Sequence, residues 1–126
     1  MAELKIFDTV TPANDGAWFA VPDPITGDAT DFELLLLGAR SNKFQNRIRA
    51  IAREREKAIR QGRTYADSDT DIETLVEITE DWRGLTENGE PVPFSKGTLR
   101  DLYKRSPDTR SAIFAFIENA KNFTKG

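Results

Sequence analysis

The stretch AWFAVPDPITGDATDFELLLLGA, residues Ala17–Ala39, decides the fold. Its two ends, AWFAV (Ala17–Val21) and DFELLLLGA (Asp31–Ala39), are apolar and typical of strands. The segment between them carries two prolines and a glycine, which favour a turn. The pattern predicts an antiparallel β-hairpin with a long tip loop. Because two strands alone are marginal in water, we expect the hairpin to lie on helices or to join a neighbour's sheet.

Most of the remaining chain shows helical periodicity, with apolar residues recurring every three or four positions. A serine precedes three of the four predicted helices, and serine is among the preferred N-cap residues. The predicted helices span Ser41 to Gln61-Gly62, Thr70 to Trp82, Ser95 to Lys104 and Pro107 to Phe123. We therefore predict an α+β fold, predominantly helical, with an N-terminal β-hairpin followed by about four helices.

A small turn or hairpin joint is predicted between the second and third helices, in DWRGLTENGEPVPFS (Asp81–Ser95). Gly84 is expected to end the second helix, and Asn88-Gly89 favours a type I′ turn. Ser95 is expected to cap the next helix. Three apolar side chains are expected to hold the joint against the core: Trp82, Leu85 and Phe94.

The length of 126 residues predicts a single domain, residues 1–126. Within it we expect a flexible arm at 1–15, with a loose segment or short strand at Leu4–Phe7, then the hairpin at 17–39 and the helical part at 41–123. The apolar run Leu34–Leu37, like the longer run Ala112–Ile117, is far short of the roughly 20 residues that span a membrane. The N-terminus lacks the basic and apolar regions of a secretory signal, so we expect a cytoplasmic protein.

The chain contains no histidine and no cysteine. This composition excludes serine–histidine and cysteine–histidine catalysis and cysteine-based metal sites. We therefore expect a protein that is not an enzyme and that has no catalytic residues, cofactor or metal. The run DSDTD (Asp67–Asp71) resembles the start of a calcium loop, but Ile72 and Ile78 stand where that loop needs glycine and glutamate. Acidic residues at the start of a helix are the better interpretation.

Charge is unevenly distributed, although the formal net charge is only −3. Residues 40–63 contain nine basic and two acidic side chains, whereas residues 67–90 contain nine acidic and one basic. Such segments can pair within one chain or between copies, and head-to-tail pairing between copies builds rings or helical arrays. The candidate self-association and partner surface comprises Arg47, Arg49, Arg53, Arg55, Arg60, Glu73, Glu77, Glu87 and Glu90.

Three stretches in a fixed order carry a family resemblance. They are DGAWFAVPDPITGDATDFELLLLGARSNKFQ (Asp15–Gln45), DWRGLTENGEPVPFSKGTLRDLY (Asp81–Tyr103) and AFIENAKNF (Ala115–Phe123). Together they resemble the tail assembly chaperones of long-tailed, siphovirus-type bacteriophages and prophages. One departure is GARS (Gly38–Ser41), where the family pattern is G-x-D-S, although Ser41 still stands at the N-cap.

The resemblance implies a non-enzymatic binding protein of phage morphogenesis. Such chaperones bind and solubilise the tape-measure protein, help to recruit tail-tube subunits, and self-associate in spirals. The resemblance also implies a location in the host cytoplasm and absence from the mature virion.

Two other classes of function stay open. One is a different phage structural protein, such as a head–tail connector or tail-completion protein, which would be present in purified virions. The other is a small nucleic-acid-binding regulator, because arginines on a helix can neutralise phosphates. The acidic overall composition and the lack of aromatic residues among the arginines make nucleic acid the less favoured partner.

Overall fold

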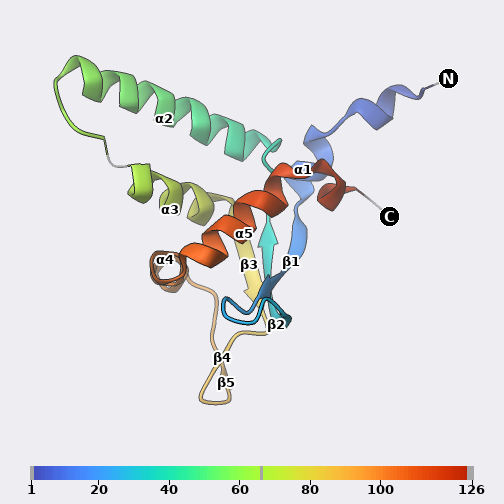
Figure 1. Cartoon of the computed structure of the whole chain (residues 1–126). Helices are drawn as coiled ribbons and strands as arrows, with labels where there is room; N and C mark the ends of the chain where they lie inside the picture. The colour runs from blue at the N-terminus through green and yellow to red at the C-terminus, as the bar shows by residue number, and fades with distance from the viewer. Residues whose placement is uncertain (1, 66, 125–126) are drawn as a thin grey trace.

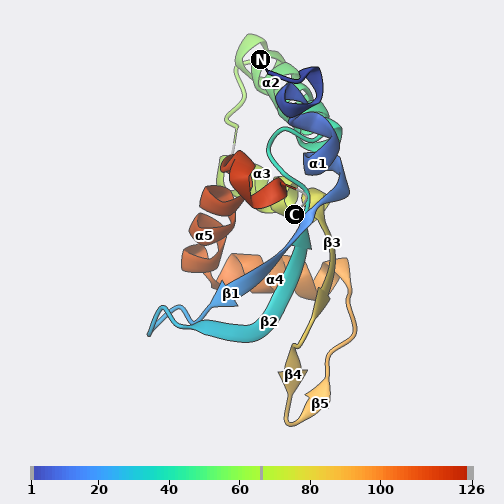
Figure 2. The same ribbon diagram turned by 90° about the vertical axis from the view of Figure 1, so that its right-hand side faces the viewer.

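An antiparallel sheet with helices packed on one face forms the centre of the computed structural model, which describes residues 2–65 and 67–124 (Figure 1, Figure 2). The strand order is β1 (Ala17–Pro22), β2 (Ala29–Leu36) and β3 (Thr79–Arg83). The core lies between this sheet and helices α3 (Asp67–Ile78), α4 (Lys96–Arg105) and α5 (Pro107–Glu118). The predicted α+β class, with a hairpin followed by helices, is confirmed.

The β1–β2 hairpin forms as predicted, with Phe19 opposite Leu34. Phe32, Leu34 and Leu36 alternate along β2 and are buried. This period of two places them on the face that meets the helices. At the tip, Asp23 Oδ1 accepts hydrogen bonds from the two backbone amides of Ile25 and Thr26, at 2.8 and 3.2 Å. The prediction that the hairpin would lie on helices is therefore confirmed.

The sheet has a third strand that the sequence did not predict. The second helix was expected to continue to Trp82, but α3 ends at Ile78 and the chain continues as β3. Trp82 pairs with Leu34 of β2, in the middle of the sheet. Gly84 therefore follows a strand rather than ending a helix. The prediction was wrong because Thr79 and Trp82 are three positions apart, a spacing that fits one face of a helix. In the structure a register shift between Leu35 and Leu36 of β2 lets both residues be buried in a strand, which pairing with β2 stabilises.

The N-terminal region is more ordered than expected. Leu4–Phe7 forms a 3₁₀ turn (η1) rather than a strand, and helix α1 spans Val10–Asp15. Two backbone-directed hydrogen bonds fix α1 to the segment that joins β2 to the next helix. Gly38 N donates to Ala13 O at 3.0 Å, and Asn42 N donates to Asn14 Oδ1 at 2.8 Å. The last six residues of the predicted arm therefore form a helix that is bonded to the rest of the chain.

Helix α2 (Asn42–Arg60) is the longest helix and begins and ends close to its predicted limits. Ser41 Oγ accepts from Phe44 N at 3.2 Å, and Gln61 is the C-cap. The caps predicted for the last two helices are also present, since Ser95 Oγ accepts from Thr98 N and Ser106 Oγ accepts from Thr109 N. The final segment is shorter than predicted, because α5 ends at Glu118 and a 3₁₀ turn, η2 (Ala120–Phe123), follows it.

The predicted joint before α4 is a small projecting ribbon. Strands β4 (Thr86–Glu87) and β5 (Glu90–Pro91) pair around Asn88 and Gly89, which both have the positive φ values that a type I′ turn requires. At its base, Trp82 Nε1 donates to Val92 O at 2.8 Å. Trp82 is buried, and three further side chains of the joint pack against the core: Leu85, Val92 and Phe94.

Candidate self-association surface

Helix α2 presents a basic stripe on the side away from the core. Four cationic side chains follow one another at intervals of four, four and three residues, which places them on one face of a helix. All four are exposed, whereas Ile51 and Ala58 on the opposite face are buried. We call these four residues the basic stripe: Arg49, Arg53, Lys57 and Arg60.

The basic stripe is only partly paired. Arg60 forms an ion pair with Glu56 at 2.7 Å, and Arg49 donates to the side-chain oxygen of Asn46 at 2.8 Å. In the described part of the chain, Arg53 and Lys57 make no side-chain hydrogen bond or ion pair. Neighbouring like charges four residues apart on a helix repel one another, so an acidic partner would relieve this repulsion.

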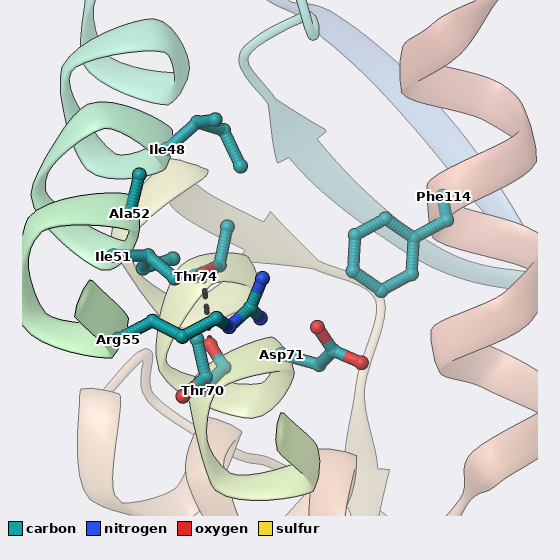
Figure 3. Close-up of a pocket in the computed structure, with 8 residues that line it drawn as sticks. All are labelled: Ile48, Ile51, Ala52, Arg55, Thr70, Asp71, Thr74 and Phe114. Atoms are coloured by element: carbon teal, nitrogen blue, oxygen red, sulfur yellow. Dashed lines mark hydrogen bonds between the residues drawn. The ribbon is translucent and has the colours of Figure 1, made fainter. Parts of the chain in front are cut away.

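The other two candidate arginines of α2 turn toward the chain's own core. Figure 3 shows Arg55 reaching toward α3 across an open cleft of about 190 Å³ between α2, α3 and α5. Its guanidinium carbon lies 5.5 Å from the centre of the Tyr65 ring. Arg47 is half-buried, and its Nε is a buried atom without a hydrogen-bond partner. These two arginines therefore face the acidic helix within one chain.

The cleft in Figure 3 is lined by four apolar and four polar side chains from three helices. Its polar members are Arg55, Thr70, Asp71 and Thr74, and Thr74 Oγ1 donates to the backbone of Thr70 at 2.8 Å. Among the residues that the structure describes, no group of three or more acidic side chains is placed to hold a metal ion.

Glu73 belongs to an intramolecular pair rather than to a free acidic surface. Arg100 of α4 donates to its two carboxylate oxygens at 2.6 and 3.2 Å. These hydrogen bonds are the main reason that the pKa of Glu73 lies below its ordinary value, and the positive charges of Arg100, Arg47 and Lys104 lower it further. The pair joins α3 to α4. Glu77 lies on the same helix, is exposed, and has no hydrogen bond or ion pair among the described residues.

The other two candidate acids, Glu87 and Glu90, stand opposite each other on the β4–β5 ribbon. Both are exposed, and their side chains make no hydrogen bond or ion pair among the described residues. Like charges directly opposite each other destabilise a strand pair. The ribbon therefore carries an uncompensated negative charge at its tip, next to the turn Asn88-Gly89.

The basic stripe and the acidic ribbon lie at opposite ends of the molecule. Figures 1 and 2 both show α2 at one end, the β4–β5 ribbon projecting at the other, and the sheet with α3–α5 between them. The two charged ends of one chain therefore lie too far apart to pair with each other. A contact between such unlike surfaces of different copies would extend into rings or filaments.

The nine residues of the predicted self-association and partner surface do not form one continuous surface in the structure. Arg49, Arg53 and Arg60 share the outward face of α2, and Glu87 and Glu90 share the ribbon tip. The other four occupy different surroundings: Arg47, Arg55, Glu73 and Glu77. Lys57 was not singled out as part of the surface, although its spacing from Arg53 on the helix places it there. The partner of Glu73, Arg100, was missed because the two residues lie on different helices.

A scan against protein-family models, a search of curated proteins and a search of solved structures each found no match to this chain. Within the described residues, no helix has both the length and the apolar character needed to cross a lipid bilayer.

Proposed function

We propose that this protein is a tail assembly chaperone of a long-tailed bacteriophage or prophage. In this role it acts in the host cytoplasm as a non-enzymatic binding protein. It binds the tape-measure protein, keeps it soluble and helps to recruit tail-tube subunits. The proposal rests on the resemblance of three ordered stretches to that family and on one structural observation.

That observation is the separation of opposite charges at the two ends of the molecule. The exposed basic stripe on α2 and the exposed pair Glu87 and Glu90 lack sufficient partners within the chain. Copies joined through these ends would form an open array along a long partner. Repeated weak contacts then give high avidity for that partner without a strong single site.

The test is co-expression with the tape-measure protein of the same phage. We expect the tape-measure protein to stay soluble and to co-purify with this chain, and we expect purified virions to lack the chain. An insoluble tape-measure protein that is not retained would contradict the proposal. Presence of the chain in virions would favour a head–tail connector or tail-completion protein instead.

The basic stripe also favours a second candidate, binding to nucleic acid. Cations at regular helical spacing can contact successive phosphates, and such binding weakens steeply with salt. Retention of the protein on DNA at moderate salt, lost in an Arg53→Glu/Lys57→Glu variant, would favour this function. We expect the protein to pass through without retention, because its net charge is negative.

A further inference from the structure

The residues before α1 form an apolar arm that does not pack on its own chain. Leu4, Ile6 and Phe7 are 87%, 62% and 68% exposed. A hollow of about 230 Å³ separates this arm from the C-terminal turn η2. Three large apolar side chains exposed within four residues differ from the single exposed apolar residues that are normal on a protein surface, and such clustering favours an interaction site.

An apolar groove lies at the other end of the molecule. It has a volume of about 370 Å³, within the range of about 300–1,000 Å³ that is common for ligand pockets. The groove runs between the tip of the β1–β2 hairpin and the end of α4. Its apolar walls are formed by Val21, Pro22, Phe32, Leu85 and Leu102.

The polar groups of the groove are already satisfied by the chain itself. Thr30 Oγ1 donates to Val21 O at 2.6 Å, and the hydroxyl oxygens of Ser106 and Thr109 lie 2.6 Å apart in a mutual hydrogen bond. Asp23 Oδ1 accepts from two backbone amides of its own turn. Because each polar side chain of the groove already makes a hydrogen bond within the chain, the chemistry favours an apolar occupant over a polar ligand.

The arm and the groove each adjoin one of the two charged ends. The arm leads directly into α1, which the 2.8 Å hydrogen bond from Asn42 N to Asn14 Oδ1 fixes at the start of α2. The groove includes Leu85, the residue immediately before β4. The arm therefore belongs to the end that carries α2, and the groove belongs to the end that carries the acidic ribbon. Where these two ends of different copies meet, an arm and a groove lie on the facing sides.

We propose that the N-terminal arm of one copy fills the apolar groove of the next copy, with Leu4, Ile6 and Phe7 as the inserted side chains. This inference rests on the self-association that belongs to the proposed function. The contact adds burial of apolar surface to a charge contact that solvent and salt would weaken. It also makes all copies in an assembly point the same way, because the arm of one copy can bind only the groove of the next and not another arm.

Disulfide cross-linking tests this contact directly, because the natural chain contains no cysteine. A Phe7→Cys protein is mixed with a Pro24→Cys protein, since Pro24 lines the rim of the groove and is exposed. Under mild oxidation we expect the mixed disulfide to form at least about tenfold faster than between Phe7→Cys and Ile59→Cys proteins, because contact raises the effective concentration. Ile59 is a matched control, since it is 69% exposed and lies on α2, outside both the arm and the groove.

Equal rates for the two mixtures would overturn the proposal. A chain that carries both Phe7→Cys and Pro24→Cys and closes a disulfide within itself at high dilution would also overturn it, because the arm would then occupy its own groove. If the proteins self-associate and bind the tape-measure protein without the predicted cross-link, this inference fails and the proposed function stands. If the cross-link forms but no tape-measure protein is bound, the proposed function fails instead.

A second pair of variants measures the contribution of the arm to association. Phe7→Ser is expected to raise the dissociation constant of self-association by about tenfold, since the lost burial of one large apolar side chain is of that order. Ile59→Ser removes an equally exposed apolar side chain and is expected to change it by less than about twofold. Equal effects of the two substitutions would contradict a specific role for the arm.

Discussion

The hydroxyl oxygens of Thr79 and Tyr103 lie 2.8 Å apart inside the core, where both side chains are almost completely buried. Thr79 Oγ1 also donates its proton to Leu75 O at 2.7 Å. Because a threonine hydroxyl has one proton, Tyr103 is the donor in the bond between the two side chains. This chain of hydrogen bonds fixes the residue at which α3 gives way to β3, and it connects that point to α4.

Substitutions at these two positions are expected to have unequal effects. Tyr103→Phe removes a donor and leaves Thr79 bonded to Leu75, so we expect a loss of about 1 kcal/mol in the free energy of unfolding. Thr79→Val leaves the buried Tyr103 hydroxyl without its acceptor and is expected to cost about 2 kcal/mol. Urea denaturation measures both values. A larger loss for Tyr103→Phe would contradict the assigned donor.

Burial raises the pKa of Tyr103 above its ordinary value of about 10. The unfolded chain therefore loses this proton at lower pH than the folded chain. The resulting stability is fully present below about pH 10 and decreases above it, at a limiting slope of about 1.4 kcal/mol per pH unit. Denaturation between pH 9 and pH 11 should show this decrease in the natural protein and a smaller decrease in Tyr103→Phe.

Gly84 is required by a close approach of two backbone segments. Its φ is +79°, and a Cβ at this position would overlap the carbonyl oxygen of Asp31. We expect Gly84→Ala to lower the free energy of unfolding by about 3 kcal/mol, from overlap and backbone strain together. Gly27→Ala is the matched control, because Gly27 has φ +80° and open space around it. Its cost should be limited to the backbone strain of about 1 kcal/mol.

Substitution of Glu73 is expected to change the stability of the fold, whereas substitution of the ribbon acids Glu87 and Glu90 is expected to change self-association. Since the hydrogen bonds from Arg100 lower the pKa of Glu73, this pair stabilises the fold above the ordinary pKa of a glutamate, and that stability is lost as the pH falls through the lowered pKa. Glu73→Gln should therefore reduce stability at pH 7 more than at pH 3, and leave self-association unchanged. Solvent screens this pair, because both side chains are about two-fifths exposed, so we expect a small loss.

Glu87→Gln/Glu90→Gln should show the opposite behaviour. These two acids face each other and lack partners, so their removal is expected to leave the stability unchanged or slightly raised. Self-association should weaken, and sedimentation velocity would measure it. A variant that loses stability but still associates normally would exclude the ribbon from the contact.

Local signals made much of the fold predictable. Ser41, Ser95 and Ser106 accept hydrogen bonds from the amides that their positions indicated, and Asn88-Gly89 forms the predicted reversal. Each of these features depends on residues within four positions along the chain. Local reasoning is therefore sufficient for caps and tight turns.

The errors arose where distant residues decide the structure. Thr79–Arg83 forms a strand because β2 pairs with it from more than 40 positions earlier in the chain. Likewise, helical periodicity places Arg53 and Arg55 on different faces of α2, but only the position of α3 shows which of them faces the chain's own acids. The sequence therefore identified the charged residues of the candidate surface, but it did not show how they are arranged in space.

The measurement that tests head-to-tail association most directly is a charge exchange between the two ends. One variant carries Arg49→Glu, Arg53→Glu and Lys57→Glu, and the other carries Glu87→Lys and Glu90→Lys. By sedimentation velocity, we expect each end variant alone to be monomeric and their mixture to associate again, because the reversed ends attract each other. Association of either variant alone, or a mixture that stays monomeric, would contradict head-to-tail contact through these ends.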